Sequence, residues 1–357
     1  MVQEIWSLGK VILAAVRRLS SAIKLDQMTD EQLLDLRICD LPLSLEGTYL
    51  ERRVTRLYEE MAARSLHFKP HVWLSEEWFT PDGIPGFAIP FYLAHPRLSK
   101  LERQQMLEVE GGTEKECLRI MRHEAGHAID NAFLLHRTLR YRTLFGSFTR
   151  PYPDWYKPEP ASRDYVLHLP AWYAQAHPAE DFAETFAVWL APKSQWRKRY
   201  QGWSALGKLE YVNQLMKEIA GKSPLNNSRK READLREVKI TLREHYYRKR
   251  QHYAFKGSPD YDSDLLRIFS SEPRHKSSRS AVSFLRRHRR ELCHEVAEGT
   301  GAHTYAIDQL LALMMNRCRE LKLRVSLKPE HALQKALVSL TSQTIRGIYT
   351  GYHRIAL

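Results

Sequence analysis

The chain has 357 residues, of which 43% are hydrophobic and 27% are charged, and its formal net charge is +13. Such a length and composition allow a sizeable buried core and about two domains, and they exclude a disordered or fibrous chain. The four scattered cysteines lack metal-finger spacing and exclude a disulfide framework, while the positive charge favours acidic partners such as nucleic acid, anionic lipid or an acidic protein.

A short apolar run at residues 11–16 lies near the N-terminus, with Lys10 before it and Arg17 and Arg18 after it. A signal peptide needs a longer apolar centre behind its positive charge, and a membrane-spanning helix needs about 20 apolar residues. The run therefore predicts an amphipathic helix that packs on the body of the protein, with attachment to a membrane surface as the alternative. We expect a cytoplasmic protein without a transmembrane segment, in which residues 1–45 form an N-terminal helical segment.

Two short β-prone runs follow a predicted helix at residues 49–64. The first spans residues 71–74 and the second runs from Phe87 to Leu93, with a turn-forming cluster of proline and glycine between them. Pro90 cannot donate a ladder hydrogen bond, which favours an edge position for the second run. An extended peptide can join such an edge as an added strand, so we expect the substrate along Phe87 to Leu93.

A helix is predicted next, running to about His136, and it carries the sequence His-Glu-Ala-Gly-His at residues 123–127. His123 and His127 are four residues apart, or about 40° around the helix, so both imidazoles can reach one point in space. Glu124 projects beside that point, where it could deprotonate a metal-bound water. The pattern predicts two ligands and the general base of a zinc site.

A third ligand is required, because a catalytic zinc takes three protein ligands and keeps one position open. The metzincin spacing fails, since it needs glycine and histidine at the positions that hold Asp130 and Phe133. His136 lies about 180° around the same helix from His127 and cannot reach the metal. Asp130 could orient a histidine or form a surface pair, and we leave it outside the catalytic set.

A second helix is predicted to begin near Pro178, after a long loop at residues 148–170 that is rich in proline and aromatic residues. Glu180 and Glu184 lie on one face of this helix among apolar side chains, where unpaired carboxylates would be costly. We therefore predict Glu180 as the third ligand and Glu184 as the carboxylate behind a ligating histidine. His177 is a rival ligand, and one glutamate could instead be a helix N-terminal charge.

The combination of His-Glu-Ala-Gly-His with Tyr173, Glu180 and Glu184 resembles a family of bacterial zinc-binding metallopeptidases. It is also similar to the catalytic domain of anthrax lethal factor, a gluzincin-like zincin. The resemblance covers about residues 45–195. It implies an α+β, zincin-like fold that has a small sheet with an edge strand, an active-site helix and a second helix with the third ligand.

The resemblance also implies a role for each of these residues. His123, His127 and Glu180 would bind Zn²⁺, Glu124 would be the general base, Tyr173 would stabilise the oxyanion, and Glu184 would hold a ligating histidine from behind. Without the family, Tyr173 beside Trp172 is equally well explained as a packing aromatic.

The character of the chain changes after residue 203. Residues 223–228 have the composition of a linker, and the residues that follow predict amphipathic helices with almost no strand signal. We predict a metallopeptidase domain at residues 46–202, a helix and linker at 203–228 and a basic helical domain at 229–357.

The C-terminal region contains three basic clusters, at residues 229–231, 248–250 and 286–290. They could form a surface for nucleic acid or another anionic partner. The favoured interpretation is solvated helix faces with ion pairs to neighbouring glutamates such as Glu244.

Three functions follow from these features. The leading hypothesis is a zinc metallopeptidase that hydrolyses peptide or isopeptide amide bonds with a zinc-activated water and Glu124 as general base. The second is a protease tethered to nucleic acid or another anionic partner by its basic C-terminal helices. The third is a non-catalytic, zinc-stabilised binding protein, and it is disfavoured because Glu124 is present and only three ligands are evident.

Overall fold

The computed structural model describes residues 24–254 and 261–349 of the chain. Helices dominate these residues, and the two sheets are small, with two strands each. The arrangement belongs to the α+β class, as the sequence predicts. The predicted amphipathic helix at residues 11–16 lies outside the described residues, and none of the described helices is long and apolar enough to cross a bilayer.

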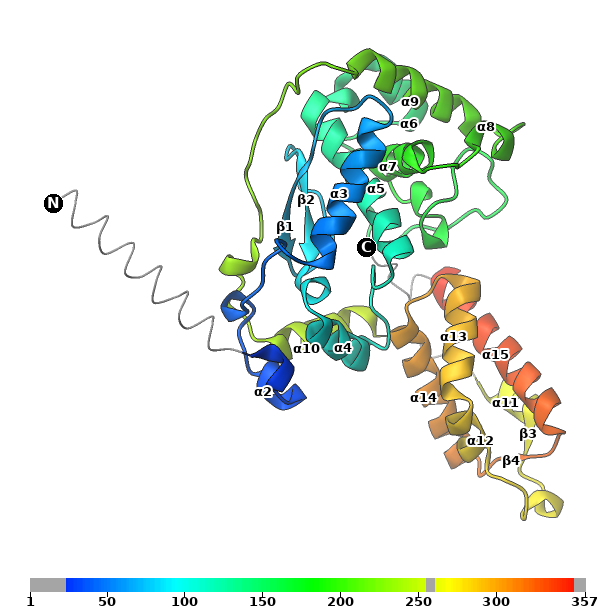
Figure 1. The fold of residues 1–357 in the computed structure, drawn as a ribbon. Helices are drawn as coiled ribbons and strands as arrows, with labels where there is room; N and C mark the ends of the chain where they lie inside the picture. The colour runs from blue at the N-terminus through cyan, green and yellow to red at the C-terminus, as the bar shows by residue number, and fades with distance from the viewer. Residues whose placement is uncertain (1–23, 255–260, 350–357) are drawn as a thin grey trace.

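The elements form two groups, one before residue 255 and one after residue 260 (Figure 1). The first contains α2 (Asp30–Leu34), α3 (Tyr49–Ala62), β1 (His71–Ser75), β2 (Gly86–Pro90), α4 (Pro96–Met106), α5 (Glu114–Phe133), α6 (Leu139–Phe145), α7 (Pro178–Leu190), α8 (Trp196–Arg199), α9 (Ala205–Ile219) and α10 (Leu242–Tyr253). The second contains α11 (Asp262–Ile268), β3 (Phe269–Ser270), α12 (Ala281–Arg287), α13 (Arg289–Thr300), α14 (Thr304–Glu320), β4 (Arg324–Val325) and α15 (Pro329–Tyr349).

Strands β1 and β2 run parallel, with His71 opposite Gly86. Strand β2 ends at Pro90, and residues 91–94 form a 3-10 turn that leads into α4. The predicted strand, which continued to Leu93, is therefore too long. Proline fixes its own φ and has no N–H to donate, so the run ends as a strand at this residue and turns instead.

The sheet edge that was predicted to receive a peptide is not open. All residues from 86 to 94 are buried, so the run from Phe87 to Leu93 presents no exposed side chain. In addition, the backbone N–H of Ala88 donates to Phe79 O at 2.8 Å. This burial disfavours the predicted docking of substrate along Phe87 to Leu93, which stays a prediction.

Helices α5 and α7 pack tightly against each other, and α5 also contacts α3 and β2 (Figure 1). Gly126 of α5 permits this approach, since a Cβ at this position would lie only 2.8 Å from the Cα of Ala183 in α7. Every residue of α7 is buried. A polar side chain on the inner face of either helix is therefore held inside the protein rather than at its surface.

The hydrophobic cores follow different boundaries from those that the sequence predicts. One core contains buried residues from Leu25 to Tyr253, and the other contains buried residues from Tyr261 to Ile348. The predicted boundaries after residues 45 and 228 both fall inside the first core. Helix α10 thus contributes Leu242, Tyr246 and Tyr253 to the first core, and it also contacts α14 of the second group.

The predicted linker at residues 223–228 is held against the first group of elements. The backbone N–H of Asn226 donates to Ala132 O at 2.9 Å, and its side-chain amide donates to Gly83 O at 2.7 Å. Shortly after it, the indole N–H of Trp73 donates to Glu232 O at 2.9 Å. These bonds to backbone carbonyls explain why the chain continues into the same core.

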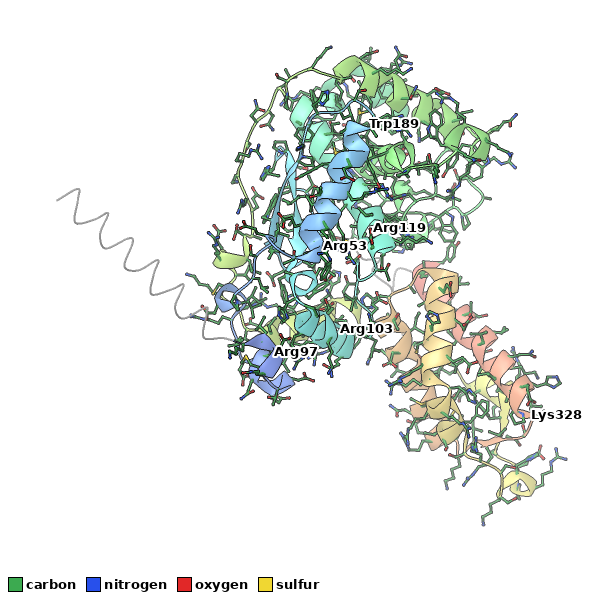
Figure 2. The ribbon with its side chains drawn as sticks, in the orientation of Figure 1. Arg53, Arg97, Arg103, Arg119, Trp189 and Lys328 are labelled. Carbon is green, nitrogen blue, oxygen red and sulfur yellow. The ribbon has the colours of Figure 1, made fainter. Side chains whose placement is uncertain are left out.

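Two of the arginines labelled in Figure 2 donate hydrogen bonds to backbone carbonyls of distant segments of the first group. Arg53 of α3 donates to Gly111 O at 3.2 Å, just ahead of α5. Arg97 of α4 donates to Met28 O in the N-terminal segment at 3.0 Å. Part of the positive charge therefore stabilises the fold. Each guanidinium donates a hydrogen bond to a backbone carbonyl oxygen that lies outside the helices and strands.

The second group is a helical bundle in which α13, α14 and α15 pack together, with β3 and β4 antiparallel beside them. Among its contacts with the first group are two hydrogen bonds. The backbone N–H of Thr304 donates to Glu108 Oε2 at 2.8 Å, and the indole N–H of Trp155 donates to Ile348 O at 3.0 Å. The second bond matters for the site, because Trp155 belongs to the long loop between α6 and α7.

Candidate metal centre

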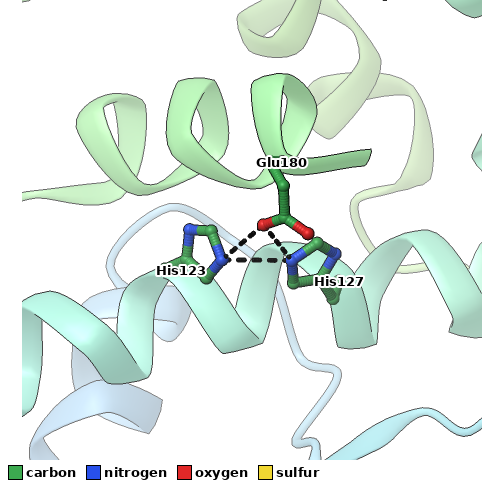
Figure 3. A group of neighbouring side chains, drawn as sticks. All are labelled: His123, His127 and Glu180. Atoms are coloured by element: carbon green, nitrogen blue, oxygen red, sulfur yellow. Dashed lines mark hydrogen bonds and ion pairs between the residues drawn. The ribbon is translucent and has the colours of Figure 1, made fainter. Parts of the chain in front are cut away.

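Helices α5 and α7 bring His123, His127 and Glu180 together (Figure 3). Nε2 of His123 lies 3.0 Å from Glu180 Oε2, and Nε2 of His127 lies 3.1 Å from the same oxygen. The two Nε2 atoms are 3.1 Å apart. One turn of α5 supplies both imidazoles, and the first turn of α7 supplies the carboxylate, so three potential ligand atoms face one point.

These three atoms fit a zinc ion. Tetrahedral zinc, with bonds of about 2.0–2.1 Å, holds its ligand atoms about 3.3 Å apart. The observed separations are 3.0–3.1 Å, so the three ligand atoms would have to move apart by only about 0.2–0.3 Å to bind zinc. Two imidazoles and one carboxylate are also the ligand set of a catalytic zinc, which keeps its fourth position open.

Glu184 lies behind the first histidine. Its Oε1 is 2.8 Å from Nδ1 of His123, and its Oε2 accepts the backbone N–H of Leu169 at 2.8 Å. The carboxylate is fully buried. A carboxylate on Nδ1 favours the tautomer in which Nδ1 carries the proton, so that Nε2 can accept a metal.

The histidines and Glu180 shift one another's pKa values. Burial alone would lower the pKa of His123, but hydrogen bonds to Glu180 and Glu184 outweigh it and raise the pKa to about 10. Burial alone would raise the pKa of Glu180, but the charge of His127 and the bonds from both histidines lower it well below its usual value. Both shifts favour a positive imidazole next to a negative carboxylate, so the charges of the three residues complement one another.

Glu124 lies at the same cavity as the ligand set. The cavity has a volume of about 230 Å³ and is lined by His123, Glu124, His127 and Glu180, among others. Glu124 Oε2 accepts a hydrogen bond from the Thr80 hydroxyl at 2.7 Å. Burial raises the pKa of this carboxyl. The arrangement gives the cavity a fixed carboxylate that does not belong to the ligand set.

Tyr173 also lines this cavity. It belongs to a 3-10 turn at Pro170–Gln175, and its ring centroid lies 5.7 Å from that of His123. Burial raises the pKa of its hydroxyl well above the usual value, so the group keeps its proton and can donate it in a hydrogen bond. The structure thus places Tyr173 at the site and in contact with a histidine ring, which suits both interpretations drawn from the sequence.

The rival residues have other partners. Nδ1 of His177 accepts the backbone N–H of Ala179 as the N-cap of α7, and its Nε2 donates to Arg150 O at 2.6 Å. His136 lies beyond the end of α5 and not on it, because Leu134 ends the helix in a left-handed conformation. Its Nδ1 is 2.8 Å from Oδ1 of the buried Asp130, so of the two alternatives for Asp130 the structure favours orienting a histidine over a surface pair.

Two residues whose side chains hydrogen-bond to carboxylates of the site were not singled out in the sequence. Thr80 holds Glu124, and Tyr152 donates its hydroxyl to Glu180 Oε1 at 2.7 Å. Each reaches its partner from a segment far away in the chain. The proline- and aromatic-rich composition of residues 148–170 indicates a functional loop, but no local pattern distinguishes Tyr152 from the loop's other aromatic residues.

Comparison with known proteins gives one match. No curated protein and no solved structure matches the chain, so the similarity to the lethal factor catalytic domain gains no support. Residues 98–199, from α4 to α8, match the family described as "Putative zinc-binding metallo-peptidase". All six residues that the sequence predicts for the site lie within this match. The segment that carries the candidate metal centre is therefore similar to this family of zinc-binding metallopeptidases.

Proposed function

We propose that the protein is a zinc-dependent metallopeptidase of gluzincin-like arrangement that hydrolyses peptide or isopeptide amide bonds. The observation that carries this proposal is the convergence of three ligand atoms within 3.1 Å of one another at a cavity that Glu124 also lines. Zinc bound by three residues would supply a polarised carbonyl and a water whose pKa is lowered toward about 7. A purely structural zinc would have all four positions filled by protein.

Glu124 is proposed as the general base. Its carboxylate is fixed by Thr80 and lies on the same face of α5 as the cavity, one residue from the first ligand. It would take a proton from the attacking water and deliver it to the leaving amine. The hydroxyl of Tyr173 would donate to the oxyanion that forms on the carbonyl oxygen.

The substrate is proposed to lie along residues 78–82 instead of the buried β2 run. Trp78, Phe79, Thr80 and Asp82 all line the cavity. Phe79 already forms a bridge to β2, so this segment continues the sheet toward the site. Backbone groups next to a sheet can accept an extended peptide as a further strand.

Location and tethering are secondary parts of the proposal. The four cysteines are all free, which supports a reducing, cytoplasmic compartment. Tethering to nucleic acid through the basic C-terminal helices has less support, because several of those cations form ion pairs within the chain. Examples are Lys249 with Glu102 at 2.9 Å, and Arg289 with Asp308.

The deciding experiment compares the wild-type chain with Glu124→Gln on a peptide library, with zinc content measured in both. We expect the variant to retain zinc and to lose cleavage by about 10²-fold or more, because an amide cannot accept the water's proton. Glu114→Gln, at an exposed position in the first turn of the same helix, is the matched control and should cleave normally. Undiminished cleavage by zinc-loaded Glu124→Gln would contradict the proposal and favour a non-catalytic zinc protein.

A further inference from the structure

Residues 150–155, here called the strap, are held at both ends and reach the metal centre between them. At one end, Nε2 of His177 donates to Arg150 O at 2.6 Å. At the other end, the indole N–H of Trp155 donates to Ile348 O, in the last turn of α15, at 3.0 Å. The strap therefore connects the N-cap of the ligand helix α7 with the C-terminal bundle.

Tyr152 is the strap residue that contacts the ligand set. Its hydroxyl donates to Glu180 Oε1 at 2.7 Å, whereas Glu180 Oε2 faces the two histidines. The two oxygens of the carboxylate thus have separate partners. The last torsion of a glutamate side chain has broad preferences, so a donor on one oxygen restricts where the other oxygen points.

The ring of Tyr152, a residue that is 56% exposed, has one packing partner that orients it. It stacks on the imidazole of His177 with centroids 3.8 Å apart and an angle of 17° between the planes. His177 in turn caps α7, the helix that carries Glu180. One short unit therefore sets both the start of the ligand helix and the orientation of its ligand.

We propose that Tyr152 is a positioning residue for the metal ligand Glu180, and that the C-terminal bundle supports it by fastening the strap through Trp155. This inference rests on the metal-binding part of the proposed function and does not depend on peptide cleavage. It gives the bundle a role in completing the metal centre. Loss of such an outer hydrogen bond to a ligand typically weakens metal binding by about 10–100-fold.

The first test measures the zinc affinity of the full chain by chelator competition. Tyr152→Phe keeps the stacked ring and removes the donor, so we expect zinc affinity to fall by about tenfold. Tyr58→Phe is the control, because its hydroxyl donates to Pro70 O at 2.6 Å, away from the cavity. It should bind zinc as the wild type does. Wild-type affinity in Tyr152→Phe would overturn the role of Tyr152.

The second test addresses the fastening of the strap. Trp155→Phe keeps an aromatic ring and removes the hydrogen bond to Ile348 O. We expect it to lower zinc affinity, but by less than Tyr152→Phe does. Trp189→Phe is the control, since it also loses an indole hydrogen bond, to Asn213 at 3.2 Å, away from the strap. Unfolding midpoints of the metal-free variants check that each has folded. Unchanged zinc affinity in folded Trp155→Phe would overturn the fastening.

The outcomes also separate this inference from the proposed function. A folded wild-type chain that takes up no zinc would overturn both. Zinc uptake that depends on Tyr152, without any peptide cleavage, would support the inference and contradict only the proposed peptidase activity.

Discussion

Glu180 and Glu184 lie one helical turn apart, and their carboxylates contact opposite sides of the same imidazole. Oε2 of Glu180 faces Nε2 of His123 at 3.0 Å, and Oε1 of Glu184 lies 2.8 Å from Nδ1. A spacing of four residues keeps both side chains on one face of α7 while separating them along its axis by about 6 Å. The imidazole fits between them, which gives one carboxylate a place in the ligand set and the other a place behind it.

At the same scale, Tyr173 can be tested by removing its hydroxyl. We expect Tyr173→Phe to lower kcat by about 10²–10³-fold with little change in KM, because an oxyanion donor acts mainly in the transition state. Zinc content should stay at the wild-type level, since Tyr173 is outside the ligand set. Tyr58→Phe is the control, as its hydroxyl donates to Pro70 O away from the cavity. Wild-type kcat in Tyr173→Phe would leave this residue as a packing aromatic.

At the scale of elements, the distance between α5 and α7 determines whether the ligands can meet. Gly126→Ala would place a Cβ 2.8 Å from the Cα of Ala183, and backbone cannot yield as a flexible side chain does. We expect a net loss of about 1–3 kcal/mol in the free energy of unfolding, together with weaker zinc binding as Glu180 moves away. Denaturant unfolding and chelator competition measure the two effects.

A second glycine provides the control for that prediction. Gly207 in α9 has open space beside its Cα, because a Cβ at this position would meet no atom of a packed neighbour within 4 Å. Gly207→Ala should raise the free energy of unfolding by up to about 1 kcal/mol, because alanine is the better helix former. If Gly126→Ala also raised the free energy of unfolding, the idea that zinc binding requires the close approach of α5 and α7 at Gly126 would be contradicted.

The turn that carries Tyr173 shows how neighbouring elements can hold an unfavourable conformation. Ala171 and Trp172 have φ values of 59° and 55°. This left-handed backbone conformation costs a residue other than glycine about 1–3 kcal/mol. The Tyr156 hydroxyl donates to Ala171 O at 2.9 Å. Gly301 of the bundle packs closely against Pro170. A Cβ added to Gly301 would lie only 2.9 Å from the Cβ of Pro170. Contacts from two sides therefore fix the turn at the edge of the cavity.

At the scale of the whole molecule, an acidic group lies where the first core meets the bundle. A cavity of about 980 Å³ there is lined by Glu108, Glu110 and Glu116 from one side and by residues of α13 and α14 from the other. Burial raises the pKa of Glu110 to about 8, with Lys249 opposing the shift and neighbouring glutamates, including Glu108 and Glu77, adding to it. We therefore expect the stability of this junction to depend on pH.

The sign of that dependence follows from the raised pKa. Between about pH 4.5 and 8 the folded protein keeps a proton on Glu110 that the unfolded chain has lost, so this residue lowers stability as pH rises. We expect Glu110→Gln to be more stable relative to wild type at pH 8 than at pH 5, as measured by urea unfolding. The exposed Glu114→Gln variant should show no such difference between the two pH values. Equal behaviour of both variants would contradict the assignment.

Helical periodicity was enough to predict which side chains of each helix lie together at the candidate metal centre. His123, Glu124 and His127 share one helix, and Glu180 and Glu184 share another, so the spacing in the sequence placed each set on one face. The start of α7 at Pro178 and the α+β class also followed from local patterns. These features depend on residues within a few positions of each other, where backbone geometry is nearly fixed.

The meeting of distant segments, in contrast, depended on the tertiary fold. Thr80 and Tyr152 reach their carboxylates across 44 and 28 residues, and Trp155 reaches Ile348 across 193. The strand that local propensity extended to Leu93 ended at Pro90, and the linker-like residues 223–228 were bound to the first core. Such outcomes depend on packing and on hydrogen bonds between remote segments, and these leave no periodic signal in the sequence.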